Sequence, residues 1–153
     1  MTTPEPRKSD PKKIVSHSVV VPAPAQDIFD LLADPRRHSE IDGSGSVKDA
    51  RIDAPARLSL GATFGMNMRI VLPYRMTNTV VEFEEGRLIG WRHFGGHVWR
   101  YILEPVEGGT KVTEQFDWNT NRSPLFLRLM NAVENNGKSI QKTLDNLVAR
   151  FSS

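Results

Sequence analysis

The sequence predicts an α+β fold in which a curved antiparallel sheet wraps around one long C-terminal helix. Seven short segments have strand-like composition and are separated by turn residues. Two short helical segments follow the first of these strands, and apolar residues recur at helical spacing over residues 124–151. A meander of antiparallel strands has one face to bury, so we expect the long helix to cover it and the first strand to pair with the last.

The expected element order is β-α-α-β6-α. The first strand, Ile14–Val21, is rich in β-branched residues and ends at Pro22. A short amphipathic helix is expected over 23–34, and a second helical turn over 35–45 is closed by glycines. The six further strands are expected at 46–53, 62–72, 74–84, 87–94, 98–105 and 109–118. The last helix has Ser123 as a suitable N-cap and Pro124 at its first position.

Composition favours a single globular domain, because 153 residues with 39% hydrophobic content suit one core. There is no cysteine, which excludes disulfides and thiolate metal sites. No apolar run resembles a signal peptide or a membrane span, so we expect a cytoplasmic protein without stable membrane insertion.

The basic charge is concentrated at the start of the chain. Residues 1–13 hold four of the 20 basic and two of the 18 acidic residues, which leaves 16 of each sign for residues 14–153. We therefore expect a disordered, Pro-rich basic tail over 1–13 and one neutral ligand-binding domain over 14–153. This distribution argues against nucleic acid as a partner.

A curved sheet that holds a single helix leaves space between the two, so a cavity is expected there. The face of the first long hairpin follows from pairing about Leu72. That register sets Phe64 opposite Val80 and Met66 opposite Asn78. It also sets Met68 opposite Met76, which gives an apolar face with one amide. These side chains either line the cavity or fill the core.

The hairpin around Gly95 and Gly96 has two possible registers. A two-residue turn pairs Phe94 with His97, whereas a three-residue loop gives a more continuous apolar stripe, which we favour. The second choice places four inward side chains, Trp91, His93, Trp99 and Tyr101. It turns Arg92 and Arg100 outward.

Strand 109–118 raises the main functional question, because its inward face carries a carboxylate, Glu114, between Val112 and Phe116. Burying an unpaired charge is costly or raises its pKa. Either Glu114 points into the cavity beside Tyr101 or His93, or it lies at a bulge or frayed end and reaches solvent.

Met130 and Gly137 fall on the inward stripe of the long helix. Glycine inside a helix costs about 1 kcal/mol relative to alanine, so a compensating feature is expected. Either the sheet approaches the helix backbone closely at Gly137, or the missing side chain leaves room for a ligand or a bend.

Other polar residues are expected to have ordinary roles. His93 and His97 have no third ligand nearby, so neither a metal nor a cofactor is expected. His38, Glu40 and Asp42 lie where they would border the cavity mouth, but a solvated surface is the favoured interpretation.

Three fragments of the chain resemble bacterial members of the START-like helix-grip superfamily (SRPBCC). They read VPAPAQDIFDLLADPRRHSEIDGSG, VVEFEEGRLIGWRH and WRYILEPVEGGTKVTEQFDW. The resemblance covers 14–151 and implies a helix-grip fold with an internal cavity. The superfamily includes polyketide cyclases/dehydrases, plant allergens and lipid-transfer domains. It shares no catalytic motif, and its members are carriers, sensors, enzymes or co-chaperones.

The favoured function is binding of a small hydrophobic, aromatic or lipid-like molecule, by a carrier or sensor that is a monomer or homodimer. The expected ligand-binding residues are Phe64, Met66, Met68, Met76, Asn78, Trp91, Trp99, Tyr101, Glu114, Phe116, Met130 and Gly137. By resemblance, the alternative is a polyketide cyclase/dehydrase that performs aldol cyclisation and dehydration. Glu114 or His93 would then be the general base and Tyr101 a hydrogen-bond donor. A co-chaperone-like interaction module is the third possibility.

Overall fold

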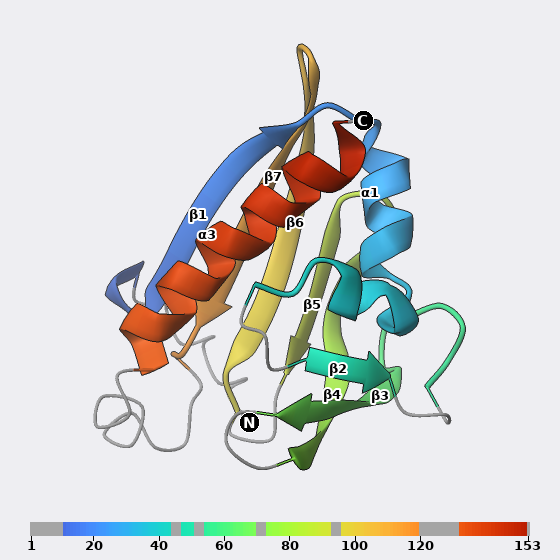
Figure 1. Cartoon of the computed structure of the whole chain (residues 1–153), viewed down its shortest axis with the longest axis vertical. Coiled ribbons are helices and arrows are strands. Elements are labelled where there is room, and N and C mark those ends of the chain that lie inside the picture. Colours follow the sequence, from blue (N-terminus) through green and yellow to red (C-terminus); the bar gives the residue numbers. More distant parts are fainter. Residues whose placement is uncertain are drawn as a thin grey trace, which may run out of the picture.

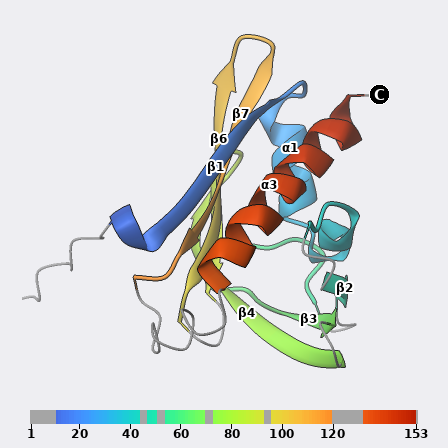
Figure 2. The same cartoon turned by 60° about the vertical axis from the view of Figure 1, so that its left-hand side comes forward.

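The computed structural model describes residues 11–43, 47–50, 54–69, 73–92, 96–119 and 132–152. It contains a seven-stranded antiparallel sheet in the order β1-β7-β6-β5-β4-β3-β2, which confirms the predicted fold (Figure 1). The strands are β1 Ile14–Val21, β2 Val47–Ala50, β3 Thr63–Arg69, β4 Pro73–Glu84, β5 Leu88–Arg92, β6 Val98–Val106 and β7 Gly109–Asp117. The two α-helices, α1 Ala25–Leu32 and α3 Ala132–Phe151, lie on one side of the curved sheet (Figure 2).

The first and last strands pair as predicted. Ile14 lies opposite Asp117 and Val21 lies opposite Thr110, so the β1–β7 ladder runs along the whole of β1. This pairing places the concave face of β1 directly beside that of β7. The same face of β7 is buried along its length, from Thr110 through the predicted Val112, Glu114 and Phe116, and on to Trp118.

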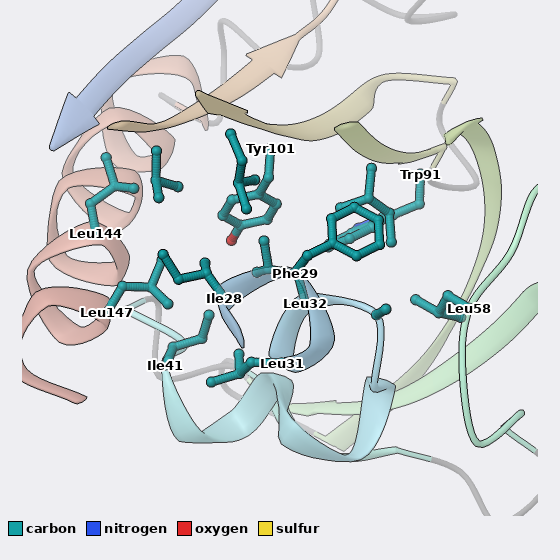
Figure 3. Packing of buried hydrophobic residues seen from close by; sticks show 14 of the residues in the cluster. Ile28, Phe29, Leu31, Leu32, Ile41, Leu58, Trp91, Tyr101, Leu144 and Leu147 are labelled. Carbon is teal, nitrogen blue, oxygen red and sulfur yellow. The ribbon is translucent and has the colours of Figure 1, made fainter. Parts of the chain in front are cut away.

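The concave face is covered by more than the long helix. Helix α1, Ala25–Leu32, buries the whole of its apolar side against the sheet through Ile28, Phe29, Leu31 and Leu32. A 3-10 helix, η2 Pro35–Glu40, follows and contributes the buried His38. Figure 3 shows Tyr101 pointing from β6 toward side chains of both α1 and α3. The prediction that the long helix alone covers the concave face was therefore incomplete. Helix α1 and η2 also pack against this face and fill part of the space beside it.

Helix α3, Ala132–Phe151, lies across β1 and β7 (Figure 1). Ile140, Leu144 and Leu147 are fully buried at spacings of four and three, which places them on one side of the helix. The predicted helix start at Ser123 and Pro124, and Met130, lie outside the described residues.

The register of the β3–β4 hairpin differs by two residues from the prediction. Phe64 lies opposite Asn78 rather than Val80, and Met66 lies opposite Met76. The pairing of Arg69 with Pro73 centres the turn one residue earlier than Leu72, and proline is tolerated there as the first residue of a strand. A register shift of two residues leaves each side chain on the same face of the sheet. Phe64, Asn78 and Val80 are accordingly buried, as predicted for the concave face. The side chains of the three methionines lie outside the described part of the structure.

The β5–β6 hairpin has the predicted faces. Trp91 pairs with Trp99 and Ile89 with Tyr101, all on the concave side. Arg100 points to the convex side, where it forms ion pairs with Glu82 and Asp117. The ladder ends at Arg92 and Val98, so the connection is longer than three residues. His93 lies outside the described residues.

The start of the described chain already belongs to the fold. Pro11–Lys13 form a 3-10 turn, and the Lys13 carbonyl accepts a hydrogen bond from the Trp118 backbone N–H. The last three residues of the predicted tail thus lie directly before β1, and Lys13 contacts the end of β7 through this hydrogen bond. Disorder of the earlier tail stays a prediction, because residues 1–10 lie outside the described ranges.

Candidate functional site

Three polar side chains form a row across the concave face. Glu114 on β7 is the cross-strand partner of His17 on β1 and of Tyr101 on β6. Directly opposed residues on one face of a sheet have neighbouring side chains. The alternation of each strand therefore brings together an imidazole, a carboxyl group and a phenol that are distant in sequence.

Glu114 is buried, with an exposed fraction of 4%. The Tyr101 hydroxyl donates a hydrogen bond to Glu114 Oε1 over 2.9 Å. The other carboxyl oxygen, Oε2, is buried and has no hydrogen-bond partner among the described residues. This confirms the inward orientation and the predicted contact with Tyr101, and it excludes the solvent-reaching alternative. Buried polar atoms in native proteins nearly always have a partner, so Oε2 needs an explanation.

The electrostatics of this pair follow from burial. Burial raises the pKa of Glu114 to about 8, the Tyr101 hydrogen bond opposes the rise, and the negative Asp42 adds to it. Burial likewise raises the pKa of Tyr101 well above its usual value, with Glu114 and Asp42 acting in the same direction. At neutral pH Glu114 is therefore mainly the uncharged acid.

Asp42 is held beside this pair by the loop after η2. The Gly43 backbone N–H donates to Thr143 Oγ1 over 2.9 Å, and Asn146 Nδ2 donates to the Ile41 carbonyl over 3.1 Å. These two bonds tie the loop to α3. Asp42 is half-buried, so it keeps some of the predicted solvent contact, and its negative charge raises the pKa of Glu114.

An aromatic group lines the part of the concave face nearer β3. His38 stacks on Trp91 with ring centres 5.1 Å apart, and Phe64 meets both rings edge-on. His38 Nε2 donates to the Leu32 carbonyl over 2.7 Å. Burial lowers the pKa of His38, while the Leu32 bond and two acidic residues oppose the shift.

The expectation that His38 lies on the solvated surface was wrong, because η2 turns it under the fold. Its sequence signal was weak, since a single histidine in a polar 3-10 segment has no periodic pattern. Glu40 is exposed as expected and pairs with Arg37 and Arg150.

A second aromatic group lies next to Glu114 along β7. Phe116 contacts Trp99 with ring centres 4.9 Å apart and His97 with ring centres 5.0 Å apart. Burial lowers the pKa of His97 to about 4, so this imidazole is neutral at physiological pH. The predicted residues Trp99 and Phe116 thus give the region beside Glu114 an apolar, aromatic wall.

Two other predicted residues have informative surroundings. Asn78 is buried, and its Oδ1 has no hydrogen-bond partner among the described residues. A Cβ atom at Gly137 would lie 3.4 Å from Val15 Cγ1 and 3.8 Å from His17 Nε2. A Cβ there would make ordinary van der Waals contacts with these side chains, so the structure shows neither a close approach of the sheet backbone nor an open space at Gly137.

Two kinds of feature are absent from the described ranges. Within them, no group of three or more potential ligands is placed to hold a metal ion. No helix in the same ranges is long and apolar enough to cross a membrane.

Known proteins share this architecture. The nearly full-length structural matches include a Nitrosomonas europaea protein with a TM-score of 0.69 at 16% identity, covering 94% of this chain and 99% of the other. A polyketide-cyclase-like protein from Corynebacterium glutamicum has a TM-score of 0.59 at 21% identity, covering 90% of this chain and 88% of the other. These likenesses show the helix-grip fold.

Sequence relatives and a family match agree with the fold. An uncharacterized Mycobacterium tuberculosis protein is 38% identical over 144 residues, which cover 90% of this chain and 64% of the relative. The chain thus spans under two thirds of that relative's length. Residues 12–152 match the family described as polyketide cyclase / dehydrase and lipid transport. With this match over nearly its whole length, the chain belongs to that family, within the START-like superfamily.

Proposed function

We propose that the protein binds a small, mostly apolar molecule between the sheet and α3, as a carrier or sensor. The observation that carries this proposal is the unpartnered Oε2 of Glu114, which is buried beside Tyr101. A buried polar atom without a partner costs about 1–3 kcal/mol, which a ligand group in contact with it recovers. Glu114 and Tyr101 then contact the polar group of the ligand.

The surroundings of Glu114 define the rest of the ligand. Phe116 and Trp99 pack against each other on the adjacent strands, and Leu144 of α3 is fully buried. Rings of this kind supply apolar area with few polar atoms, as ligand sites in proteins usually do. An aromatic or lipid-like body with one polar end fits this environment. The fold family, which includes lipid transport, supports the same ligand class.

The test is a titration with a neutral, polarity-sensitive naphthyl ketone dye. We expect one saturable site with a Kd of about 1–10 μM, and a rise in Tm with dye concentration because the ligand binds only the folded state. Trp99→Ala should weaken binding by about tenfold or more. Val106→Ala is the matched control, because Val106 is on the same strand and 39% exposed. No saturable binding, or equal losses in the two variants, would contradict the proposal.

A second candidate is an enzyme of the cyclase/dehydrase type. The observation in its favour is the pKa of Glu114, about 8, because a general base works best when its pKa lies near the working pH. In this alternative Glu114 removes a proton next to a substrate carbonyl, and the Tyr101 hydroxyl exchanges its hydrogen bond to Glu114 for one to the developing enolate. With an active substrate, Glu114→Gln would then keep binding and lower turnover by about 100-fold or more.

A further inference from the structure

The charges around Glu114 restrict the polar group that it can receive. Three titratable residues of the described chain face it from neighbouring elements: His17 from β1, Tyr101 from β6 and Asp42 from the loop after η2. No lysine or arginine of the described ranges contributes to the pKa of Glu114. The lysines that α3 carries in those ranges, Lys138 and Lys142, are exposed.

The basic residue nearest in the sheet order is turned away. Arg100 precedes Tyr101 on β6 and therefore points to the convex face. There it forms close ion pairs with Glu82 over 2.8 Å and with Asp117 over 3.0 Å. No lysine or arginine of the described residues therefore pairs with Glu114.

An uncharged Glu114 acts as a hydrogen-bond donor. Its Oε1 already accepts from Tyr101, so the acid proton belongs on Oε2, which has no partner among the described residues. The ligand atom that contacts this donor should therefore be a hydrogen-bond acceptor, such as a carbonyl oxygen.

Charged ligand ends fit less well for two separate reasons. A carboxylate would be buried beside Asp42, which already acts against negative charge at Glu114. An ammonium group would lose its hydration in an apolar site and would require Glu114 to ionise, and pairing seldom repays both costs.

We propose that this site selects uncharged ligands whose carbonyl oxygen accepts a hydrogen bond from Glu114 Oε2, in preference to carboxylates and amines of the same shape. The inference rests on the proposed function, and it adds the chemical class of the ligand's polar end. It also predicts that binding weakens once Glu114 loses its proton.

The test compares three naphthalene ligands of similar size: methyl naphthyl ketone, naphthoate and naphthylmethylamine. At about pH 6.5 we expect the ketone to bind at least about tenfold more tightly than either charged ligand. Between about pH 6.5 and about pH 9.5 the ketone affinity should fall by about 30-fold, because the pKa of Glu114 is about 8. Calorimetry at each pH measures both effects.

Two variants identify the titrating group. Glu114→Gln keeps an N–H donor in place of the acid, so it should bind the ketone within a few-fold of wild type and lose the pH dependence. Glu104→Gln makes the same change at an exposed position on β6 and should behave as wild type. His17→Gln should retain the alkaline fall, which separates Glu114 from its cross-strand neighbour.

The outcomes separate this inference from the proposed function. An amine that binds most tightly, with affinity rising as the pH rises, would overturn the preference for a carbonyl. Equal binding of all three ligands, or ketone binding by wild type that does not change with pH, would also overturn it while leaving the binding function intact. If none of the three ligands binds, the proposed function fails, and this inference fails with it.

Discussion

At the scale of single residues, Glu114 makes stability depend on pH in a defined direction. Its folded pKa of about 8 lies above its ordinary value of 4.5, so its favourable contribution is complete below pH 4.5 and is lost as the pH rises through about 8. Glu114→Gln keeps the acceptor for Tyr101 and removes the charge. We expect the variant to be more stable than wild type by a few kcal/mol above about pH 8 and little changed near about pH 4.5. Urea unfolding at each pH measures this difference, and a constant offset would contradict it.

The alternation of β7 favoured an inward Glu114, because a strand has a period of two, but it left open a bulge or frayed end that reaches solvent. The faces of the neighbouring strands offered Tyr101 or His93 as its contact, and the structure shows Tyr101. The burial of His38 could not be predicted in this way. Its position depends on how η2 folds beneath the sheet, and a six-residue 3-10 helix has too few turns to show a buried face in its sequence.

At the scale of secondary-structure elements, two glycines predict opposite effects. A Cβ at Gly43 would lie 2.5 Å from the Ser139 carbonyl oxygen and 2.6 Å from the Thr143 backbone nitrogen of α3. Gly43→Ala should therefore force the loop from the helix and destabilise the protein by about 1–3 kcal/mol. Gly137→Ala meets only ordinary contacts and gains helix propensity, so it should stabilise by up to about 1 kcal/mol. Chemical denaturation compares the two, and similar losses in both would argue against this packing.

Element identities and faces were predictable because composition, turn residues and alternation are local properties. The register of the β3–β4 hairpin was not, because alternation is unchanged when the pairing slips by two residues. The observed register is the one in which Arg69 pairs with Pro73. The roles of α1 and η2 in filling the concave face were missed for a related reason, since tertiary packing rather than periodicity places them there.

At the scale of the whole molecule, His38 and His97 make the free energy of unfolding depend on pH in the direction opposite to that of Glu114. Burial lowers the pKa of His38 below 6.5 and that of His97 to about 4. Their contribution is complete above pH 6.5 and is lost as the pH falls through the folded pKa values. In a Glu114→Gln background, we expect the free energy of unfolding to fall steadily from about pH 6.5 to about pH 4. Adding His97→Gln should reduce that slope, and an unchanged slope would show that His97 has no part in it.

The pairing of β1 with β7 also has a consequence for how the chain folds. Each of the other described ladders joins strands that are consecutive in sequence, so each closes a much shorter loop than the β1–β7 ladder does. Of the strands in the described ranges, β1 is made before the other six, yet the strand that it pairs with, β7, is made after them. Until β7 is made, β1 has no strand to form hydrogen bonds with. Pairing strands that are so far apart in sequence is characteristic of slower-folding topologies. We therefore expect the concave face to be completed, and His17 to be placed beside Glu114, late in folding.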